Sequence, residues 1–294
     1  MVEVINHPVN PYLLIDGDIF LYRCGFAVEK KKYLVTGATK DEPEISGTFN
    51  SAKEAKAYAE QCEGTIWSRR EVEPVENAIQ ATKVALREVF DKYWPKRDYW
   101  QGKIFLTGKG NFRDLLDSGR GYKDNRDPSH RPTHYRAIKE YLIKEYGASL
   151  INGEEADDAI GKEAYSRDTG TYIVVSNDKD LDQLGGFHYD WTKRLSYFVN
   201  EEEAIKFFYV QLLAGDPTDN IPGTLSKAKA ETLIGECQTP GECATAAKTI
   251  FEEKYGQEWG EKLDVIAKLA WIRRGDKDEY GRAKPPFWEH LSAA

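Results

Sequence analysis

Long apolar runs are missing from this sequence, and no stretch of about 18 apolar residues could form a helix across a bilayer. Residues 1–8 have neither a basic segment nor a long apolar core, so we expect no secretory signal and no membrane partner. Internal repeats and low-complexity tracts are also absent. Cysteine is scarce, and no C-x-x-C pair occurs among Cys24, Cys62, Cys237 and Cys243. This spacing argues against a disulfide framework or a zinc ribbon and predicts thiols in a reducing compartment, the cytoplasm.

The chain also lacks an excess of positive charge. Its net charge of −8 over 294 residues argues against a protein that coats nucleic acid through overall charge. The charge is unevenly spread, however, because residues 103–139 contain nine Lys or Arg and only four acids. This segment is either a track for phosphates or a solvated basic face, and composition does not choose between them.

What is present is an alternation of short apolar runs and amphipathic segments. Strands are expected at 12–15, 103–106, 149–151 and 172–175, with helices at 52–62, 78–94, 132–146 and 155–166. This alternation predicts an α/β fold with a mostly parallel central sheet flanked by helices. An extended pair at 188–198 precedes expected helices at 201–214, 225–235, 241–254 and 259–274. We therefore predict an α/β domain over 1–195, with a less regular insertion at 28–75, and a helical region over 196–294.

Acidic residues gather at the ends of these elements. The clusters are Asp16-Gly17-Asp18, Glu155-Ala156-Asp157-Asp158, Asp178-Lys179-Asp180 and Asp216-Pro217-Thr218-Asp219. Ligands of open parallel sheets bind outside the carboxyl ends of the strands, so acids from separate strands are expected to meet at one edge. Crowded carboxylates repel one another, and oxygen ligands suit hard divalent cations. Any single cluster could instead be a helix N-cap, and the metal-site interpretation depends on all four together.

Five segments resemble the 5′-nuclease family, which includes flap endonucleases, the 5′-nuclease domain of bacterial DNA polymerase I and small phage-type 5′→3′ exonucleases. They are residues 14–18, 121–126 (Gly-Tyr-Lys-Asp-Asn-Arg), 155–158, 176–180 and 215–223. Order and approximate spacing match from about 12 to 236. The resemblance is most specific in Tyr-Lys-x-x-Arg combined with Gly-Asp-x-x-Asp-Asn, and it does not extend to 26–76 or 240–294.

The resemblance implies a PIN-like nuclease core and a DNA 5′→3′ exonuclease or 5′-flap endonuclease that uses Mg²⁺ or Mn²⁺, with two ions expected. The candidate metal ligands are Asp16, Asp18, Glu155, Asp157, Asp158, Asp178, Asp180, Asp216 and Asp219. Lys123 and Arg126 would stabilise charge on the scissile phosphate, and Arg113, Arg120 and Tyr122 would contact the DNA strand. Expected partners are DNA with free 5′ ends or flaps and replication proteins, for a monomer in the host cytoplasm if a phage encodes it.

Residues 215–235 resemble a helix–hairpin–helix, a module that grips duplex phosphates without reading sequence. Its usual Gly-x-Gly is replaced by Gly223-Thr224-Leu225-Ser226-Lys227, so the binding of a monovalent cation there is left open. Lys227 and Lys229 could supply DNA contacts instead. A second departure follows the strand at 103–106, where many relatives carry an Asp and this chain has Thr107-Gly108.

Two other functions compete with this one. A haloacid-dehalogenase-type phosphatase would use Asp16 as nucleophile and Asp18 as acid or base, but it leaves Tyr-Lys-x-x-Arg and Glu-x-Asp-Asp without roles. An inactive DNA-binding relative is the second alternative. Exonuclease against flap-endonuclease preference, the choice between DNA and RNA strands and the role of residues 28–75 are not decided by the sequence.

Overall fold

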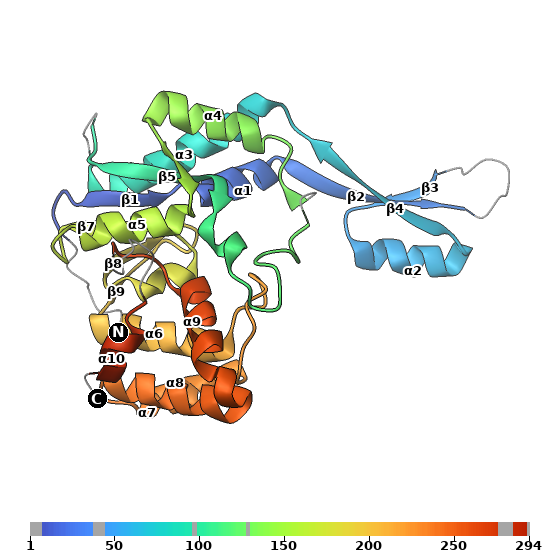
Figure 1. Cartoon of the computed structure of the whole chain (residues 1–294). Coiled ribbons are helices and arrows are strands. Elements are labelled where there is room, and N and C mark those ends of the chain that lie inside the picture. The colour runs from blue at the N-terminus through green and yellow to red at the C-terminus, as the bar shows by residue number, and fades with distance from the viewer. Residues whose placement is uncertain (1–7, 38–44, 96–98, 128–129, 276–284, 293–294) are drawn as a thin grey trace, which may run out of the picture. The chain divides into compact units, whose positions relative to one another are not determined.

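The computed structural model describes residues 8–37, 45–95, 99–127, 130–275 and 285–292 (Figure 1). The chain divides into two compact units, one of Met1–Ile19, Val89–His130 and Leu142–Ala294 and the other of Phe20–Glu88 and Arg131–Tyr141. Three of the four boundaries fall inside helices, namely α1 (Asp18–Ala27), α3 (Val75–Tyr93) and α4 (Tyr135–Tyr146), and the fourth lies between His130 and Arg131. In this division residues 196–294 cluster with the central sheet, in the first unit.

The first unit is built on a six-stranded sheet in the order β6-β5-β1-β7-β8-β9 (Figure 1). Its strands are β1 (Tyr12–Asp16), β5 (Gly102–Asn111), β6 (Ser149–Gly153), β7 (Tyr172–Val175), β8 (Gly186–Asp190) and β9 (Leu195–Val199). Neighbouring strands are parallel except β8 and β9, which pair as an antiparallel hairpin at one edge. The predicted fold class, an α/β fold with a mostly parallel sheet flanked by helices, is confirmed.

The central strands are apolar throughout because both of their faces are covered. Leu13, Leu14 and Ile15 of β1 are fully buried, as expected for a strand in the middle of a parallel sheet. Helix α5 (Ala156–Tyr165) covers one face and packs Ile160 against a cluster that includes Leu14. The hydroxyl of Tyr93, at the end of α3, lies 3.1 Å from Ser196 Oγ of β9.

Helices follow the sheet from residue 201 onward and form their own apolar core within the first unit. They are α6 (Glu201–Ala214), α7 (Lys227–Glu236), α8 (Pro240–Tyr255), α9 (Trp259–Ala270) and α10 (Phe287–Ser292). The start of α6 is fixed by Asn200, whose side chain accepts a hydrogen bond from the amide of Glu203. The predicted helical C-terminal region is therefore observed. Among the described residues, no helix is both long and apolar enough to cross a membrane.

The second unit contains a three-stranded antiparallel sheet in the order β3-β2-β4, made of β2 (Glu29–Thr36), β3 (Ile45–Phe49) and β4 (Thr65–Val72). Helix α2 (Ala52–Cys62) packs Ala55 and Ala59 against Val35 of β2. The sequence identified α2 but not the sheet. The reason is that β4 is exposed along its whole length, so it lacks the apolar alternation that reveals a half-buried strand.

Candidate metal centre

The acidic clusters lie where the parallel strands end. Asp16 is the last residue of β1, Asp178 follows the end of β7 after two residues, and Glu155 immediately precedes α5. A 3₁₀ turn over Lys179–Gln183 carries Asp180. The topology therefore delivers carboxylates from separate strands to one edge of the sheet, as the predicted parallel order requires.

Asp16 and Asp157 form the buried part of this cluster. Asp16 is 4% exposed and accepts hydrogen bonds from the amide of Asp18 (3.1 Å) and the hydroxyl of Ser176 (3.0 Å). Burial, followed by the charges of Asp18 and Asp178, raises the pKa of Asp16 to about 8. Burial and the charges of Asp16 and Asp178 also raise the pKa of Asp157, whose carboxylate has no hydrogen-bond donor among the described residues.

A second group consists of Asp180, Asp216 and Asp219. One carboxylate oxygen from each lies within 4.8 Å of the others, a spacing that one cation could bridge. Burial and the charges of Asp178 and Asp216 raise the pKa of Asp180 to about 7. A cation bound between these carboxylates would relieve the repulsion that Asp180 experiences from its neighbours. The all-oxygen donor set fits a hard divalent ion such as Mg²⁺ or Mn²⁺.

Basic side chains stand beside the acids. The ammonium of Lys123 forms ion pairs with Glu155 and with Asp219, the latter at 3.3 Å, and Arg126 pairs with Asp219. Burial opposes the charge on Lys123, but Glu155 and Asp219 outweigh it and raise the pKa of its ammonium. Both cations are therefore held in their charged forms next to the candidate metal ligands.

Tyr122 occupies a different place from the one expected for a residue that stacks on a base. Its ring is buried, and its hydroxyl lies 2.8 Å from Glu155 Oε2 and 3.0 Å from Asp219 Oδ2. Burial and the charge of Glu155 raise the pKa of this hydroxyl, so it remains a hydrogen-bond donor. Tyr122 thus joins the acids of two segments and offers no exposed face to a base.

Two motifs far apart in the sequence are joined by their backbones. The amide of Lys123 donates to the carbonyl of Asp219 (3.0 Å), and the amide of Asn220's side chain donates to the carbonyl of Gly121 (2.8 Å). Asn125 donates in the same way to the carbonyl of Pro217 (2.7 Å). Lys123 adopts a left-handed conformation (φ 57°), which is uncommon outside glycine. The Tyr-Lys-x-x-Arg and Gly-Asp-x-x-Asp-Asn segments therefore act as one structural piece.

Arg113 and Asp158 pair with each other. Arg113 Nη1 and Nη2 donate to Asp158 at 2.6 and 2.9 Å, and the guanidinium also donates to the carbonyls of Leu269 (3.0 Å) and Trp271 (2.7 Å). Their side chains are 4% and 0% exposed. Burial works against the charge on Asp158, but Arg113 lowers the pKa of its carboxyl. The structure thus gives both residues partners other than the DNA and the metal ion expected for them.

Asp18 also has a structural partner. Its carboxylate accepts a hydrogen bond from the amide of Thr107 on β5 (3.2 Å), and the Thr107 hydroxyl accepts one from the amide of Ala156 (3.0 Å). Thr107 stands where many relatives carry an Asp, and here it connects the starts of α1 and α5 to β5. The Asp18 carboxylate thus has a backbone partner on the neighbouring strand β5.

The segment expected to resemble a helix–hairpin–helix runs from α6 through a short turn into α7. Asp216 and Ile221 form an isolated antiparallel bridge in the turn, and Gly215 takes a positive φ of 67°. Arg120, Lys227 and Lys229 are all exposed, so their side chains are accessible to an anionic partner.

Sequence reasoning missed two residues that contact the acids. Ser176 donates its hydroxyl to Asp16 and accepts from the amide of Asp178 (2.9 Å). Gln211 of α6 donates to Asp180 (2.6 Å). The position of Ser176 directly after β7 was an available signal, whereas nothing in the spacing of Gln211 relates it to Asp180.

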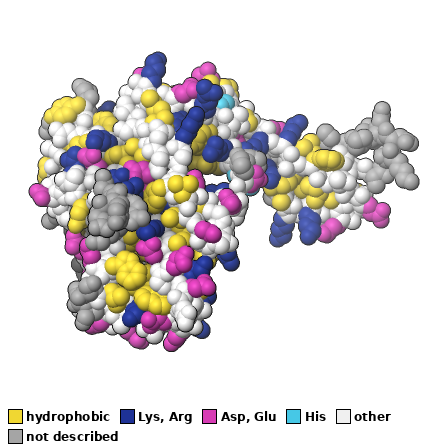
Figure 2. Space-filling model, in the orientation of Figure 1, with side chains coloured by type: hydrophobic (Ala, Val, Ile, Leu, Met, Phe, Trp, Pro, Cys, Tyr) yellow, Lys and Arg dark blue, Asp and Glu magenta, His cyan; other side chains and the backbone are white. Residues whose placement is uncertain are grey.

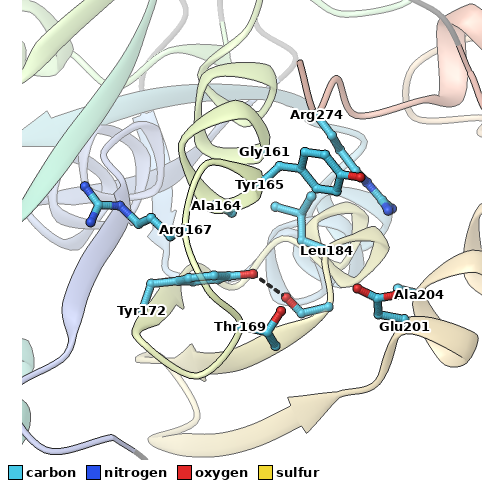
Figure 3. A pocket seen from close by; sticks show the side chains of 11 residues that line it. Gly161, Ala164, Tyr165, Arg167, Thr169, Tyr172, Leu184, Glu201, Ala204 and Arg274 are labelled. Atoms are coloured by element: carbon cyan, nitrogen blue, oxygen red, sulfur yellow. Dashed lines mark hydrogen bonds between the residues drawn. The ribbon is translucent and has the colours of Figure 1, made fainter. Parts of the chain in front are cut away.

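A small hollow of about 110 Å³ lies elsewhere in the first unit (Figure 3). It is lined by residues that include Tyr165, Arg167, Tyr172 and Glu201, and the Tyr172 hydroxyl donates to the carbonyl of Gly185 (2.6 Å). Tyr172 is the first residue of β7, whereas the acids follow its last residue. The hollow is therefore at the opposite end of the strand from the candidate metal centre and takes no part in it.

No model of a known protein family matches the sequence. Two curated proteins named 5′-3′ exonuclease are similar to it, both from Buchnera aphidicola. The one from subspecies Schizaphis graminum is 24% identical over 228 residues, which are 73% of this chain and 65% of the relative. The one from subspecies Baizongia pistaciae is 27% identical over 236 residues, 76% of this chain and 65% of the relative. The match thus spans just under two thirds of the length of these relatives.

Among solved structures, a flap endonuclease of bacteriophage T5, in a pseudo-enzyme–product complex with DNA and metal ions, is 15% identical. The match covers 65% of this chain and 90% of that one with a TM-score of 0.39, which is too low to establish a shared fold. The sequence matches to the two exonucleases support a relationship of this chain to the 5′-nuclease family.

Proposed function

We propose that this chain is a DNA 5′-nuclease that hydrolyses phosphodiester bonds with the help of divalent metal ions. The observation that carries the proposal is the convergence of acids from four segments at one sheet edge, next to Lys123 and Arg126. Similarity to two proteins named 5′-3′ exonuclease supports it. We infer 5′→3′ exonuclease and 5′-flap endonuclease activity of the phage type, on DNA with free 5′ ends or flaps.

The residues present fit two metal positions. Asp16, Asp157 and Asp178 would hold one ion, and Asp180, Asp216 and Asp219 would hold the other. Divalent ions there, Mg²⁺ or Mn²⁺, would supply Lewis acidity toward the phosphodiester. Their charge would also relieve the repulsion that raises the pKa values of Asp16 and Asp180.

Lys123 and Arg126 are the chain's own contribution to stabilising the reaction. Each is held charged by an ion pair with Glu155 or Asp219. A DNA phosphate entering this edge would meet both cations, and they would stabilise the negative charge that builds on it during attack by water. Hydrolysis in this sense leaves a 5′-phosphate and a free 3′-hydroxyl.

Contacts with the rest of the DNA are assigned to exposed basic residues. Arg120, Lys227 and Lys229 have accessible side chains, and the turn between α6 and α7 resembles the module that grips duplex phosphates. Arg113 and Tyr122 are assigned a positioning role instead, because both are buried against acids of the site. A role in DNA replication or degradation follows as an expectation from this chemistry.

A phosphatase that uses Asp16 as its nucleophile is less consistent with the geometry. Both oxygens of Asp16 accept hydrogen bonds, and its raised pKa favours the protonated, weakly nucleophilic form near neutral pH. The phosphatase also gives no task to Lys123 and Arg126.

The test is cleavage of a 5′-labelled duplex and a 5′-flap DNA in Mg²⁺ by the wild type and by Asp157→Asn. Loss of a carboxylate that positions a metal ion should lower the rate by about 10³-fold or more, because the metal contributes several kcal/mol. Asp168→Asn removes an exposed acid outside the cluster and is the matched control. Wild-type cleavage by Asp157→Asn, or an equal loss in the control, would refute the assigned site.

A further inference from the structure

Among the described residues, α2 is the helix that packs against the small β3-β2-β4 sheet, and it covers one face. Tyr33 and Val35 of β2 contact α2 and so define the covered face. Because side chains alternate along a strand, Lys32 and Leu34 point to the opposite face, called here the open face, where Leu34 is itself buried. The register of the sheet places Arg69 opposite Lys32 and Trp67 opposite Leu34, on that same face.

Two side-chain contacts confirm this placement. The indole nitrogen of Trp67 donates to the hydroxyl of Thr36 at 3.2 Å, and the ammonium of Lys32 donates to the side chain of Asn50 at 2.5 Å. The first contact fixes one edge of the indole to the sheet while 61% of Trp67 remains exposed. A large aromatic side chain is therefore held in a defined orientation at the surface, and the protein core makes no use of it.

The strands around Trp67 are basic in a chain that is acidic overall. Figure 2 shows Lys and Arg side chains at the surface of the second unit. On the face that carries Trp67, these strands place Lys30, Lys32 and Arg69 beside a single acid, Glu71. Lys31 and Arg70 lie on the face that α2 covers. A surface that carries an excess of positive charge attracts a negatively charged polymer.

We propose that the open face of the β3-β2-β4 sheet binds single-stranded DNA, with a base stacked on Trp67 and phosphates held by Lys32 and Arg69. Aromatic side chains combined with basic groups are how proteins bind unpaired strands without sequence preference, since every base has a flat face to stack. A duplex would not serve as well, because its bases are already stacked on one another. This binding proposal depends on the proposed nuclease function in one respect only, which is the choice of DNA as the polyanion that binds.

A second copy of this chain is the main competing occupant, since β4 is an edge strand. Consecutive charged residues Arg69, Arg70 and Glu71 lie on that edge, and charges of this kind hinder edge-to-edge pairing of strands. The charge of the face therefore favours DNA over self-association.

The experiment measures binding of a fluorescein-labelled oligo(dT) of about 20 nucleotides by fluorescence anisotropy, in EDTA so that no cleavage occurs. Trp67→Ala should weaken binding roughly tenfold, and Trp67→Phe should lose less because it keeps a stacking ring. The double variant Lys32→Glu/Arg69→Glu should also weaken binding and lower the salt dependence by about 0.7 per lost phosphate contact. The double variant Lys53→Glu/Lys56→Glu on the exposed side of α2 makes the same charge change and should bind nearly as the wild type.

Location is read independently by photocrosslinking with an oligonucleotide that contains 5-iododeoxyuridine, followed by mass spectrometry. A crosslink on the peptide that contains Trp67 supports the proposal, and crosslinks confined to other peptides overturn it. Unchanged binding by Trp67→Ala, or an equal loss in the α2 variant, also overturns it. So does a wild-type dimer in sedimentation that Trp67→Ala dissociates without any change in DNA binding.

These outcomes are separable from failure of the proposed nuclease. Binding is measured without divalent ions, so a chain that never cleaves DNA can still bind oligo(dT) through Trp67. Conversely, Trp67→Ala could leave both the cleavage of duplex ends in Mg²⁺ and the binding of oligo(dT) unchanged. That result would retain the nuclease proposal and overturn the proposed binding of DNA to the open face.

Discussion

The two sheets of this molecule treat charge in opposite ways. At the edge of the parallel sheet, acids and bases are buried and paired, as with Asp158 and Arg113. On the small antiparallel sheet Arg69 and Glu71 also form an ion pair, at 2.9 Å, but both side chains are exposed to solvent. Burial makes each charge depend on a fixed partner, because an unpaired ion in the interior is costly. Exposure leaves charges available to bind something that arrives from outside.

The difference in burial suggests a different function for each region. The buried cluster holds groups in fixed positions, which suits chemistry on a single phosphate. The exposed face of the β3-β2-β4 sheet holds groups that can adjust, which suits binding along a strand. Removing one charge at a time from each region should therefore have large effects in the buried cluster and small effects on the exposed sheet.

The largest effect on stability is expected from Arg113→Met. It leaves Asp158 buried without its partner and should lower the free energy of unfolding by about 3–5 kcal/mol in urea denaturation. Adding Asp158→Asn to the same chain should recover part of that loss, because the stranded charge is then gone. A loss below about 1 kcal/mol would mean that the pair is far better hydrated than its burial indicates.

The next largest effect is expected on the reaction rate from Lys123→Met. If Lys123 stabilises charge that develops on the phosphate, kcat should fall by about 10²–10³-fold while KM changes little. Flap DNA in Mg²⁺ is the substrate, and Lys109→Met, an exposed basic residue on β5, is the comparison. A rise in KM with an unchanged kcat would assign Lys123 to DNA binding instead.

A smaller effect is expected from pH in the metal-free protein. The pKa of Asp180 is raised to about 7, so between about pH 4 and pH 7 the folded state holds a proton that the unfolded state has released. Stability from this group is therefore complete at low pH and is lost as pH rises toward 7. Relative to the wild type, Asp180→Asn should gain about 1 kcal/mol or more between pH 5 and pH 8 in EDTA.

The pH comparison has its own control and its own contradiction. Asp168→Asn, at an exposed acid, should show no such gain over the same range. Saturating Mg²⁺ should raise the free energy of unfolding of the wild type more than that of Asp180→Asn, because a cation that binds the folded state interacts more strongly with the carboxylate. A difference between the two chains that stays constant from pH 5 to pH 8 would contradict the raised pKa.

The smallest effect is expected from Arg69→Ala. This variant removes an exposed ion pair with Glu71, and such pairs contribute between 0 and about 1 kcal/mol. Its melting temperature should stay within a few degrees of the wild type. A loss comparable to that of Arg113→Met would abolish the contrast between the two sheets.

The sequence was most informative where local pattern and burial agree. The bounds of α6 match the expected 201–214, because Asn200 and Glu203 form a recognisable start and apolar residues follow at helical spacing. The strands ending at Asp16 and Val175 were equally clear, since a fully buried parallel strand is a continuous apolar run. From these strands the meeting of Asp16 with Asp178 followed by topology.

The partners of the basic residues could not be predicted in the same way. Arg113 lies 45 residues from Asp158 and 156 residues from Leu269, and no local pattern encodes such distant contacts. Tyr122 was expected to contact the DNA strand because the family resemblance implies it, yet it is buried and donates to Glu155 and Asp219. The small sheet was missed because exposed strands such as β4 carry almost no apolar signal.

The hydrogen bonds of Arg113 to the carbonyls of Leu269 and Trp271 have a consequence for anyone who shortens this chain. Gln183 holds the same stretch, donating to the carbonyl of Ala270 and accepting from the amide of Ile272. Removing the segment after α8 would strip acceptors from a buried guanidinium that braces Asp158. A shortened chain that keeps this buried pair therefore cannot end with the sheet, because carbonyl groups after α8 are among the hydrogen-bond partners of Arg113.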